Sequence, residues 1–195
     1  MTVFEPSNDP RPTFAASLNQ VEHQVDALEP EDMDRPTPCE EYDVRTLIAH
    51  LVAVLRKLEV VRHGGDMRQV PDPAVEVDGD AVAALRRART ALDEAWVEAA
   101  ALDPEYSVAW GTMTGCELLD AYTHEFTVHA WDLAQASGRG PELDPTLAEA
   151  AIEWFSSNVP ADDRSDEGGP FGPVVPVASG ADEYTRLAGF VGRQV

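Results

Sequence analysis

The segment from Asp43 to His63 constrains the fold most, because its apolar residues recur at helical spacing over roughly five turns. Its core-facing positions are Val44, Leu47, Ile48, Leu51, Leu55 and Leu58. Asp43 is a good N-cap, and Gly64-Gly65 provides a stop signal. The sequence therefore predicts a long amphipathic helix here, and such a helix must bury its apolar side against another element.

Three further segments share this helical pattern. A first helix is predicted from Thr13 to Leu28, a third from about Asp80 to Leu102, and a fourth from near Thr114 to Ala136. No strand alternation is sustained and no internal repeat is found. We therefore predict an all-α fold in which four main helices form a bundle.

The residues after the fourth segment predict additions to this bundle. A shorter helix is expected from Pro145 to about Ser157, followed by a loop over 158–169. Residues 170–184 are too rich in Pro and Gly for a helix and predict an extended strap, after which 185–193 form a last helical turn. A polar loop over 65–80 joins the second and third helices as a lid or a surface connection. We expect one domain over 1–195, with the bundle over about 11–158 and the C-terminal strap over 159–195.

The charge balance limits the classes of partner. The chain has 14 basic and 36 acidic residues, a net charge of −22, which disfavours nucleic acid and anionic membranes as partners. No apolar run reaches the roughly 18 residues of a membrane helix, and the N-terminal residues do not resemble a signal peptide. Cys39 and Cys116 fit no paired-cysteine metal spacing. The sequence therefore predicts a cytoplasmic protein that acts on small molecules.

The apolar side of the fourth helix carries three ionisable residues, Glu125, His129 and Asp132. At about 100° per residue they fall in the same arc as Leu118 and Tyr122. A bundle normally places Leu, Ile or Val there, and an unpaired buried carboxylate is costly. Glu125 and His129 are four residues apart, so their side chains meet on one face of the helix. A shared cation explains this pair, and a buried ion pair that includes Asp132 is the alternative.

The second helix offers a further ligand, His50, at the edge of its apolar stripe. His50, Glu125 and His129 together form a two-nitrogen, one-oxygen set that suits zinc and also iron or nickel. Three protein ligands leave one coordination position open, as in catalytic sites. The alternative for His50 alone is an ordinary core histidine. Asp132 is predicted either to orient His129 or to make a capping or inter-helix hydrogen bond.

Two residues beside this set have less defined roles. Cys39 either packs at the start of the second helix or places a thiol near the metal face, and no flanking base favours a lowered pKa. His124 falls at the flank of the fourth helix, which predicts a surface position or a role in orienting a ligand. Neither residue is assigned to the metal-ligand set.

Four stretches together resemble a known family: RPTPCEEYDVRTLIAHLV, HEFTVHAWDLAQASG about 75 residues later, PFGPVVPV and RLAGFVGR. They are similar to actinobacterial metal-binding proteins of the DinB-like four-helix superfamily, and to the N-terminal domain of mycothiol-dependent maleylpyruvate isomerase. The resemblance implies an up-down-down-up bundle with a divalent ion, usually zinc, held by His50, Glu125 and His129. Tyr42 departs from the Trp that relatives often carry. The tail after Pro170 is too short for the separate C-terminal domain of the isomerase.

Three functions are consistent with this site. The first is a metal-dependent transferase or isomerase that uses a low-molecular-weight thiol such as mycothiol, because a Lewis-acidic ion lowers the pKa of a thiol. The others are a metal-dependent hydrolase and a non-enzymatic, stress-associated metal-binding bundle. Tyr122 and Asp132 are candidate bases, and Arg56 or Arg62 is a candidate anchor for an anionic substrate. A homodimer is expected by analogy only.

Overall fold

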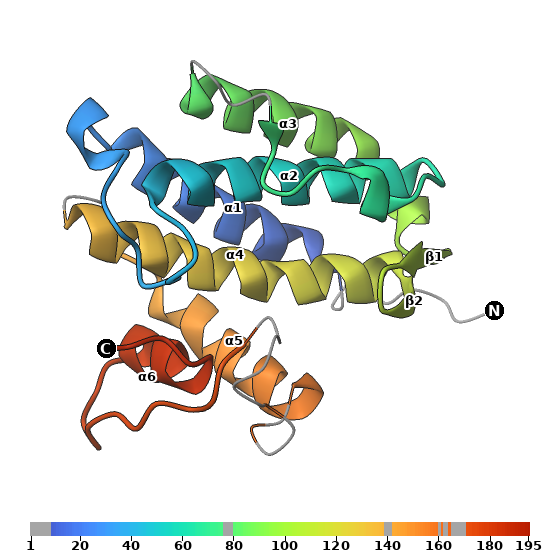
Figure 1. The fold of residues 1–195 in the computed structure, drawn as a ribbon. Coiled ribbons are helices and arrows are strands. Elements are labelled where there is room, and N and C mark those ends of the chain that lie inside the picture. The colour runs from blue at the N-terminus through green and yellow to red at the C-terminus, as the bar shows by residue number, and fades with distance from the viewer. Residues whose placement is uncertain (1–8, 76–79, 139–141, 160, 162–163, 165–170) are drawn as a thin grey trace.

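Four long helices form a bundle in the computed structural model, which describes residues 9–75, 80–138, 142–159, 161, 164 and 171–195. They are α1 (Arg11–Asp26), α2 (Val44–Arg62), α3 (Ala81–Trp96) and α4 (Gly115–Ser137). In Figure 1, α1 and α4 run in one direction and α2 and α3 run in the other. The all-α fold and the up-down-down-up order are therefore confirmed.

Local capping fixes the ends of the two helices that matter most for the site. At the start of α2, the Asp43 carboxylate accepts a hydrogen bond from the Thr46 amide at 2.8 Å. At the start of α4, Thr114 and Glu117 form a capping box, in which the Glu117 carboxylate accepts from the Thr114 amide at 2.8 Å. Gly138 follows α4 with a φ of 64°. These ends agree with the prediction to within two residues.

The third helix is shorter than predicted, and a hairpin follows it. α3 ends at Trp96, before the 3-10 turn η5 (Ala99–Ala101) and the antiparallel strands β1 (Glu105–Val108) and β2 (Gly111–Thr114). The prediction of a helix to Leu102 was wrong, and the hairpin was not predicted. Two other 3-10 turns are η2 (Pro30–Asp32) and η3 (Met67–Gln69).

The hairpin was missed for a physical reason. Its strands have four residues each, which is too few for alternation to be recognised. Its position depends instead on tertiary contacts, such as the hydrogen bond from the Ala109 amide to the Met67 sulfur at 3.3 Å. A local pattern therefore could not predict it.

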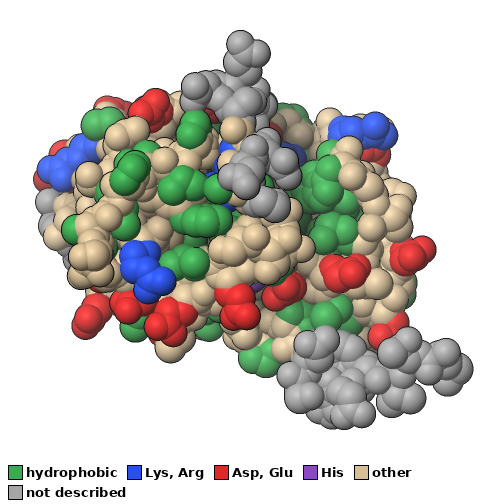
Figure 2. All heavy atoms as spheres, turned by 90° about the horizontal axis from the view of Figure 1, so that it is seen from below, with side chains coloured by type: hydrophobic (Ala, Val, Ile, Leu, Met, Phe, Trp, Pro, Cys, Tyr) green, Lys and Arg blue, Asp and Glu red, His purple; other side chains and the backbone are tan. Residues whose placement is uncertain are grey.

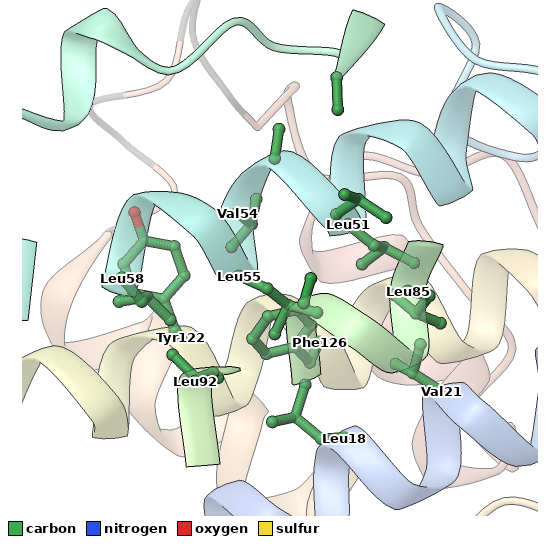
Figure 3. Packing of buried hydrophobic residues seen from close by; sticks show 14 of the residues in the cluster. Leu18, Val21, Leu51, Val54, Leu55, Leu58, Leu85, Leu92, Tyr122 and Phe126 are labelled. Atoms are coloured by element: carbon green, nitrogen blue, oxygen red, sulfur yellow. The ribbon is translucent and has the colours of Figure 1, made fainter. Parts of the chain in front are cut away.

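The main core lies between the four long helices (Figure 3). Each helix contributes side chains that are almost completely buried, among them Leu18, Val21, Leu51, Leu55, Leu58, Leu85, Leu92, Tyr122 and Phe126. The predicted stripe of α2 is fully part of this core. The core therefore holds α2 and α4 in fixed positions, and these are the helices that carry the candidate ligands.

A second hydrophobic cluster covers the opposite side of α4. It is built from α4, α5 (Pro145–Asn158) and α6 (Glu183–Phe190), which lie together below α4 in Figure 1. His124 belongs to this side. Only 4% of its surface is exposed, and its ring lies 5.1 Å from Trp154 and 6.3 Å from Phe155. A surface position for His124 was therefore a wrong prediction, because α5 covers the flank of α4 that the sequence pattern left open.

The C-terminal segment is extended before α6 and returns to the body of the molecule. The Val175 amide donates to the Gly189 carbonyl at 2.8 Å, and a Cβ on Gly189 would lie 2.7 Å from the Val175 carbonyl oxygen. Glycine thus permits this close contact between the extended backbone at Val175 and α6. Most of the predicted loop over 158–169, and 76–79 of the predicted loop over 65–80, lie outside the described residues. No described helix is both long and apolar enough to cross a membrane.

Candidate metal centre

Two helices bring His50, Glu125 and His129 together. His50 lies near the middle of α2, whereas Glu125 and His129 occupy successive turns of α4. The three side chains offer ligand atoms that all lie within 4.8 Å of one another. Nε2 of His50 is 3.3 Å from Oε1 of Glu125, and the His50 and His129 ring centroids are 5.1 Å apart. The three residues singled out in the sequence therefore form one compact group.

Each histidine of this group has its Nδ1 held by a carboxylate. Nδ1 of His50 lies 2.8 Å from Oδ1 of Asp72, and Nδ1 of His129 lies 3.0 Å from Oδ2 of Asp132. Metal-binding histidines commonly donate their second ring nitrogen to such a carboxylate, which fixes the tautomer and the ring orientation. Both rings are thus oriented to present Nε2 to a ligand. Of the two roles considered for Asp132, the geometry favours the orientation of His129.

Asp132 is itself fixed by a residue from the C-terminal end of the chain. The Nε and Nη2 groups of Arg193 donate to the two Asp132 oxygens at 3.0 and 3.1 Å. The Asp132 side chain is fully buried and that of Arg193 is 12% exposed. A bidentate pair of this kind is geometrically specific. It connects the C-terminal segment to the ring of His129.

Asp72 has a similar position behind His50 and was missed in the sequence. It lies in the loop between α2 and α3, and its second oxygen accepts from the Lys57 ammonium at 2.6 Å. One acid among 36 in a polar loop carries no sequence signal of its own. The signal that was available is Lys57. It lies seven residues after His50, and therefore on the same side of α2, where it can pair with an acidic side chain.

The electrostatics of the group favour a positive charge. Burial opposes a charge on the His50 ring, but hydrogen bonds with Asp72 and Glu125 outweigh it and raise the pKa of His50 to about 9. Burial also disfavours the Glu125 carboxylate, yet the hydrogen bond with His50 holds the pKa of Glu125 below its ordinary value. Burial disfavours the Asp132 carboxylate in the same way, and the hydrogen bond with His129 nevertheless lowers the pKa of Asp132. A proton on His50 and a bound cation would therefore compete for the same negative surroundings.

The donor set fits a divalent transition-metal ion. Two imidazoles and one carboxylate are common zinc ligands, and two donors on one tetrahedral zinc ion lie about 3.4 Å apart. The distance of 3.3 Å between His50 Nε2 and Glu125 Oε1 matches that spacing. The orienting carboxylates behind both rings complete the arrangement expected of a metal site. Among the described residues the group has three members, which leaves a coordination position for solvent or substrate.

A pocket of about 430 Å³ opens beside this group. Its walls come from segments that are distant in the sequence: the residues before α2, α2 itself, the hairpin, α4, α5 and the C-terminal strap. The lining residues are Cys39, Glu41, Tyr42, His50, Trp110, Met113, Ala121, Tyr122, Glu125, Val128, His129, Trp154, Phe155, Val159, Phe171 and Arg193. A concave, largely apolar site with a few convergent polar groups is typical of small-molecule binding.

The other candidate residues have different positions. Cys39 lines the pocket, but burial raises the pKa of its thiol. Burial also raises the pKa of Tyr122, so this phenol stays protonated at neutral pH and is a poor base. Arg62 donates to the Ala95 carbonyl at 3.0 Å on the α3 side of the bundle, away from the pocket. Arg62 is therefore not the predicted substrate anchor, and Arg56 is not among the described pocket-lining residues.

Comparisons with known proteins agree with this architecture. Residues 14–134 match the family model described as the mycothiol maleylpyruvate isomerase N-terminal domain. Over 161 residues the chain is 29% identical to the uncharacterized protein Rv0738 of Mycobacterium tuberculosis strain H37Rv, and the match covers 82% of this chain and 84% of that protein. The same figures hold for the uncharacterized protein MT0763 of M. tuberculosis strain CDC 1551.

Solved structures show the same fold. The crystal structure of the mycothiol-dependent maleylpyruvate isomerase matches with a TM-score of 0.55 at 20% identity, and the match covers 80% of this chain and 75% of that one. The crystal structure of a histidine-to-alanine mutant of that isomerase matches equally well. The family match includes α2, which carries His50, and the part of α4 that carries Glu125 and His129. The chain therefore belongs to the mycothiol maleylpyruvate isomerase N-terminal domain family.

Proposed function

We propose that this protein binds a divalent metal ion through His50, Glu125 and His129 and uses it, with a mycothiol-type thiol, in a transferase or isomerase reaction on a small molecule. The observation that carries the proposal is the convergence of the three donors beside a pocket, with a carboxylate behind each histidine. Family membership supports the thiol as co-substrate. Zinc is the favoured ion because of the donor types, and nickel or iron suits the same set.

When bound, the ion would lower the pKa of a thiol or water at its open position. The chain contributes the rest of the site. Asp72 and Asp132 hold the two rings, and Arg193 fixes Asp132. The aromatic side chains of the pocket limit the access of water to the reacting groups.

Metal-dependent hydrolysis is the alternative within the same geometry, since the open position can take water instead of a thiol sulfur. A non-enzymatic, metal-binding role is the other alternative. The pocket beside the three-residue group favours an enzyme, because an ion that only stabilises the helices has no use for an accessible cavity. Thiol-dependent turnover separates the first function from hydrolysis.

The test compares His129→Ala with the wild type in metal content and activity. We expect zinc affinity to fall by more than about 100-fold, because loss of a ligand exceeds the 10- to 100-fold effect of an orienting partner. Turnover of mycothiol with a panel of electrophiles should be lost in the same variant. The measurements are competition against a chromogenic chelator and thiol-consumption assays.

The matched control is His63→Ala, which removes an exposed histidine at the end of α2. It should leave both zinc affinity and turnover unchanged. Equal zinc uptake by His129→Ala and the wild type would refute the metal site. Zinc uptake without thiol consumption, but with hydrolytic turnover, would favour the hydrolase.

A further inference from the structure

The pocket beside the candidate metal centre has two aromatic walls. One is formed by Trp110, at the turn between β1 and β2, and Tyr122 of α4, whose rings lie 6.2 Å apart. The other is formed by Trp154 and Phe155 of α5 with Phe171 of the strap, at ring separations of 5.3 and 4.8 Å. Flat apolar groups gain most from such walls, because aromatic rings favour stacked and edge-on contacts.

Each cationic group among the described lining residues of this pocket is already paired with a carboxylate: His50 with Asp72 and Glu125, and Arg193 with Asp132. Arg193 is the one Lys or Arg among them, and its Nε and Nη2 are engaged by the buried Asp132 carboxylate. Lys57 is paired with Asp72 outside the lining. The carboxylates on the wall add negative charge, and they belong to Glu41 and Glu125.

The surface around this side of the molecule follows the same trend. Seen from below, hydrophobic side chains are spread over the face, a row of acidic side chains crosses its lower half, and a few Lys or Arg side chains lie mainly toward the sides (Figure 2). With a net charge of −22, the protein as a whole also repels anions. Apart from an ion at the candidate metal centre, neither the described walls of the pocket nor their surroundings therefore attract a substrate with several carboxylates.

From these observations we infer that the pocket binds an uncharged aromatic group as the main body of the substrate, in preference to a carboxylate-bearing one. The inference rests on the proposed function for the reaction that follows binding. The binding of the substrate itself depends on the side chains that line the pocket. An unpaired carboxylate on these walls would lose its hydration without gaining a counter-charge. A neutral ring instead exchanges water for aromatic contacts. The volume of about 430 Å³ lies within the range typical of small-molecule pockets.

The test uses a matched pair of probes, naphthalene-1-methanol and naphthalene-1-carboxylate, which differ in charge but little in shape. Binding to the full-length protein is measured by isothermal titration calorimetry, both as purified and after chelator treatment. The metal-free form obtained by chelator treatment matters because a carboxylate could otherwise bind through the ion. We expect the alcohol to bind the chelator-treated protein at least about tenfold more tightly than the carboxylate.

Trp110→Ala probes the wall without disturbing the core, since 62% of Trp110 is exposed. We expect this variant to weaken binding of the alcohol by at least about threefold. The control is Val97→Ala, which removes a similarly exposed apolar side chain (64%) outside this pocket and should change nothing. Equal or tighter binding of the carboxylate to the chelator-treated protein would overturn the inference. Unchanged binding of the alcohol by Trp110→Ala would also overturn it.

The result separates the two proposals. A protein that takes up zinc and turns over thiol, but does not bind the alcohol, refutes the aromatic pocket alone. A protein that binds the alcohol but takes up no zinc supports the pocket and refutes the proposed metal-dependent function.

Discussion

At the scale of single residues, the candidate ligand histidines depend on charged groups from elsewhere in the chain. His50 contacts Asp72, which lies 22 residues later. His129 contacts Asp132, which in turn binds Arg193, 61 residues away. Each carboxylate also increases the negative potential at the site. The side chains behind the histidines thus contribute both orientation and charge.

Asp72→Asn tests the orienting carboxylate at His50. The amide keeps the size of the side chain but removes its charge and weakens its hold on Nδ1 of the ring. We expect zinc affinity to fall by about 10- to 100-fold, with little change in the fold. Competition against a chromogenic chelator measures the affinity, and circular dichroism checks the fold.

The control for Asp72→Asn is Asp66→Asn in the same loop. Asp66 accepts from the Arg68 amide at 3.0 Å and is not among the lining residues of the pocket. This variant should bind zinc as the wild type does. If Asp72→Asn also retained full affinity, the role of Asp72 as an orienting acceptor would be wrong.

At the scale of elements, α4 determines the site because it is buried on two sides. Its bundle side packs on α1, and its opposite side packs on α5 and α6. The hairpin before α4 sets where the helix begins and holds Trp110 at the pocket. The join between hairpin and helix is Gly115, where a Cβ would lie 2.2 Å from the Ala101 carbonyl oxygen.

Gly115→Ala should therefore destabilise this join. The backbone around Ala101 must shift to accept the methyl group, and we expect a loss of about 1–3 kcal/mol in the free energy of unfolding. Urea denaturation followed by circular dichroism measures the change. Gly180→Ala is the matched control, because nothing lies within 4 Å of its added Cβ. Similar stability of both variants would show that the close contact at Gly115 is not required.

At the scale of the whole molecule, the C-terminal segment returns to complete the pocket. Phe171 and Arg193 lie on its walls, and Arg193 joins the buried Asp132 of α4. Because this ion pair is bidentate and largely shielded from water, it couples the docking of the C-terminal segment to the position of α4. The same pair reaches the candidate metal centre through His129.

Arg193→Met should cost about 3–5 kcal/mol in the free energy of unfolding, because it leaves the Asp132 carboxylate buried without its cation. The double variant Asp132→Asn/Arg193→Met removes both charges and should recover much of that loss. Zinc affinity should be lower in the double variant than in the wild type, because His129 then lacks its charged partner. Urea denaturation in chelator and zinc titration give the two readouts. Wild-type zinc affinity in the double variant would contradict an orienting role for Asp132.

The sequence by itself determined the elements with long, regular patterns. The cap at Asp43, the apolar stripe of α2 and the helical spacing of the fourth segment closely predicted the two helices that carry the candidate ligands. The helical period also grouped Glu125, His129 and Asp132 on one face, since residues three and four apart must be neighbours. These features depend on local geometry, which a single segment specifies.

The tertiary structure alone decided which distant groups meet. Asp72 and Arg193 come from a loop and from the C-terminal segment, where no periodicity restricts the direction of a side chain. The hairpin was missed because its strands are short, and His124 was misplaced because the cover by α5 is not visible in the pattern of α4. Metal binding by these residues stays a prediction, whereas their convergence is decided by packing. Long-range contacts bring together side chains from different elements, but the local pattern can only arrange side chains within one helix.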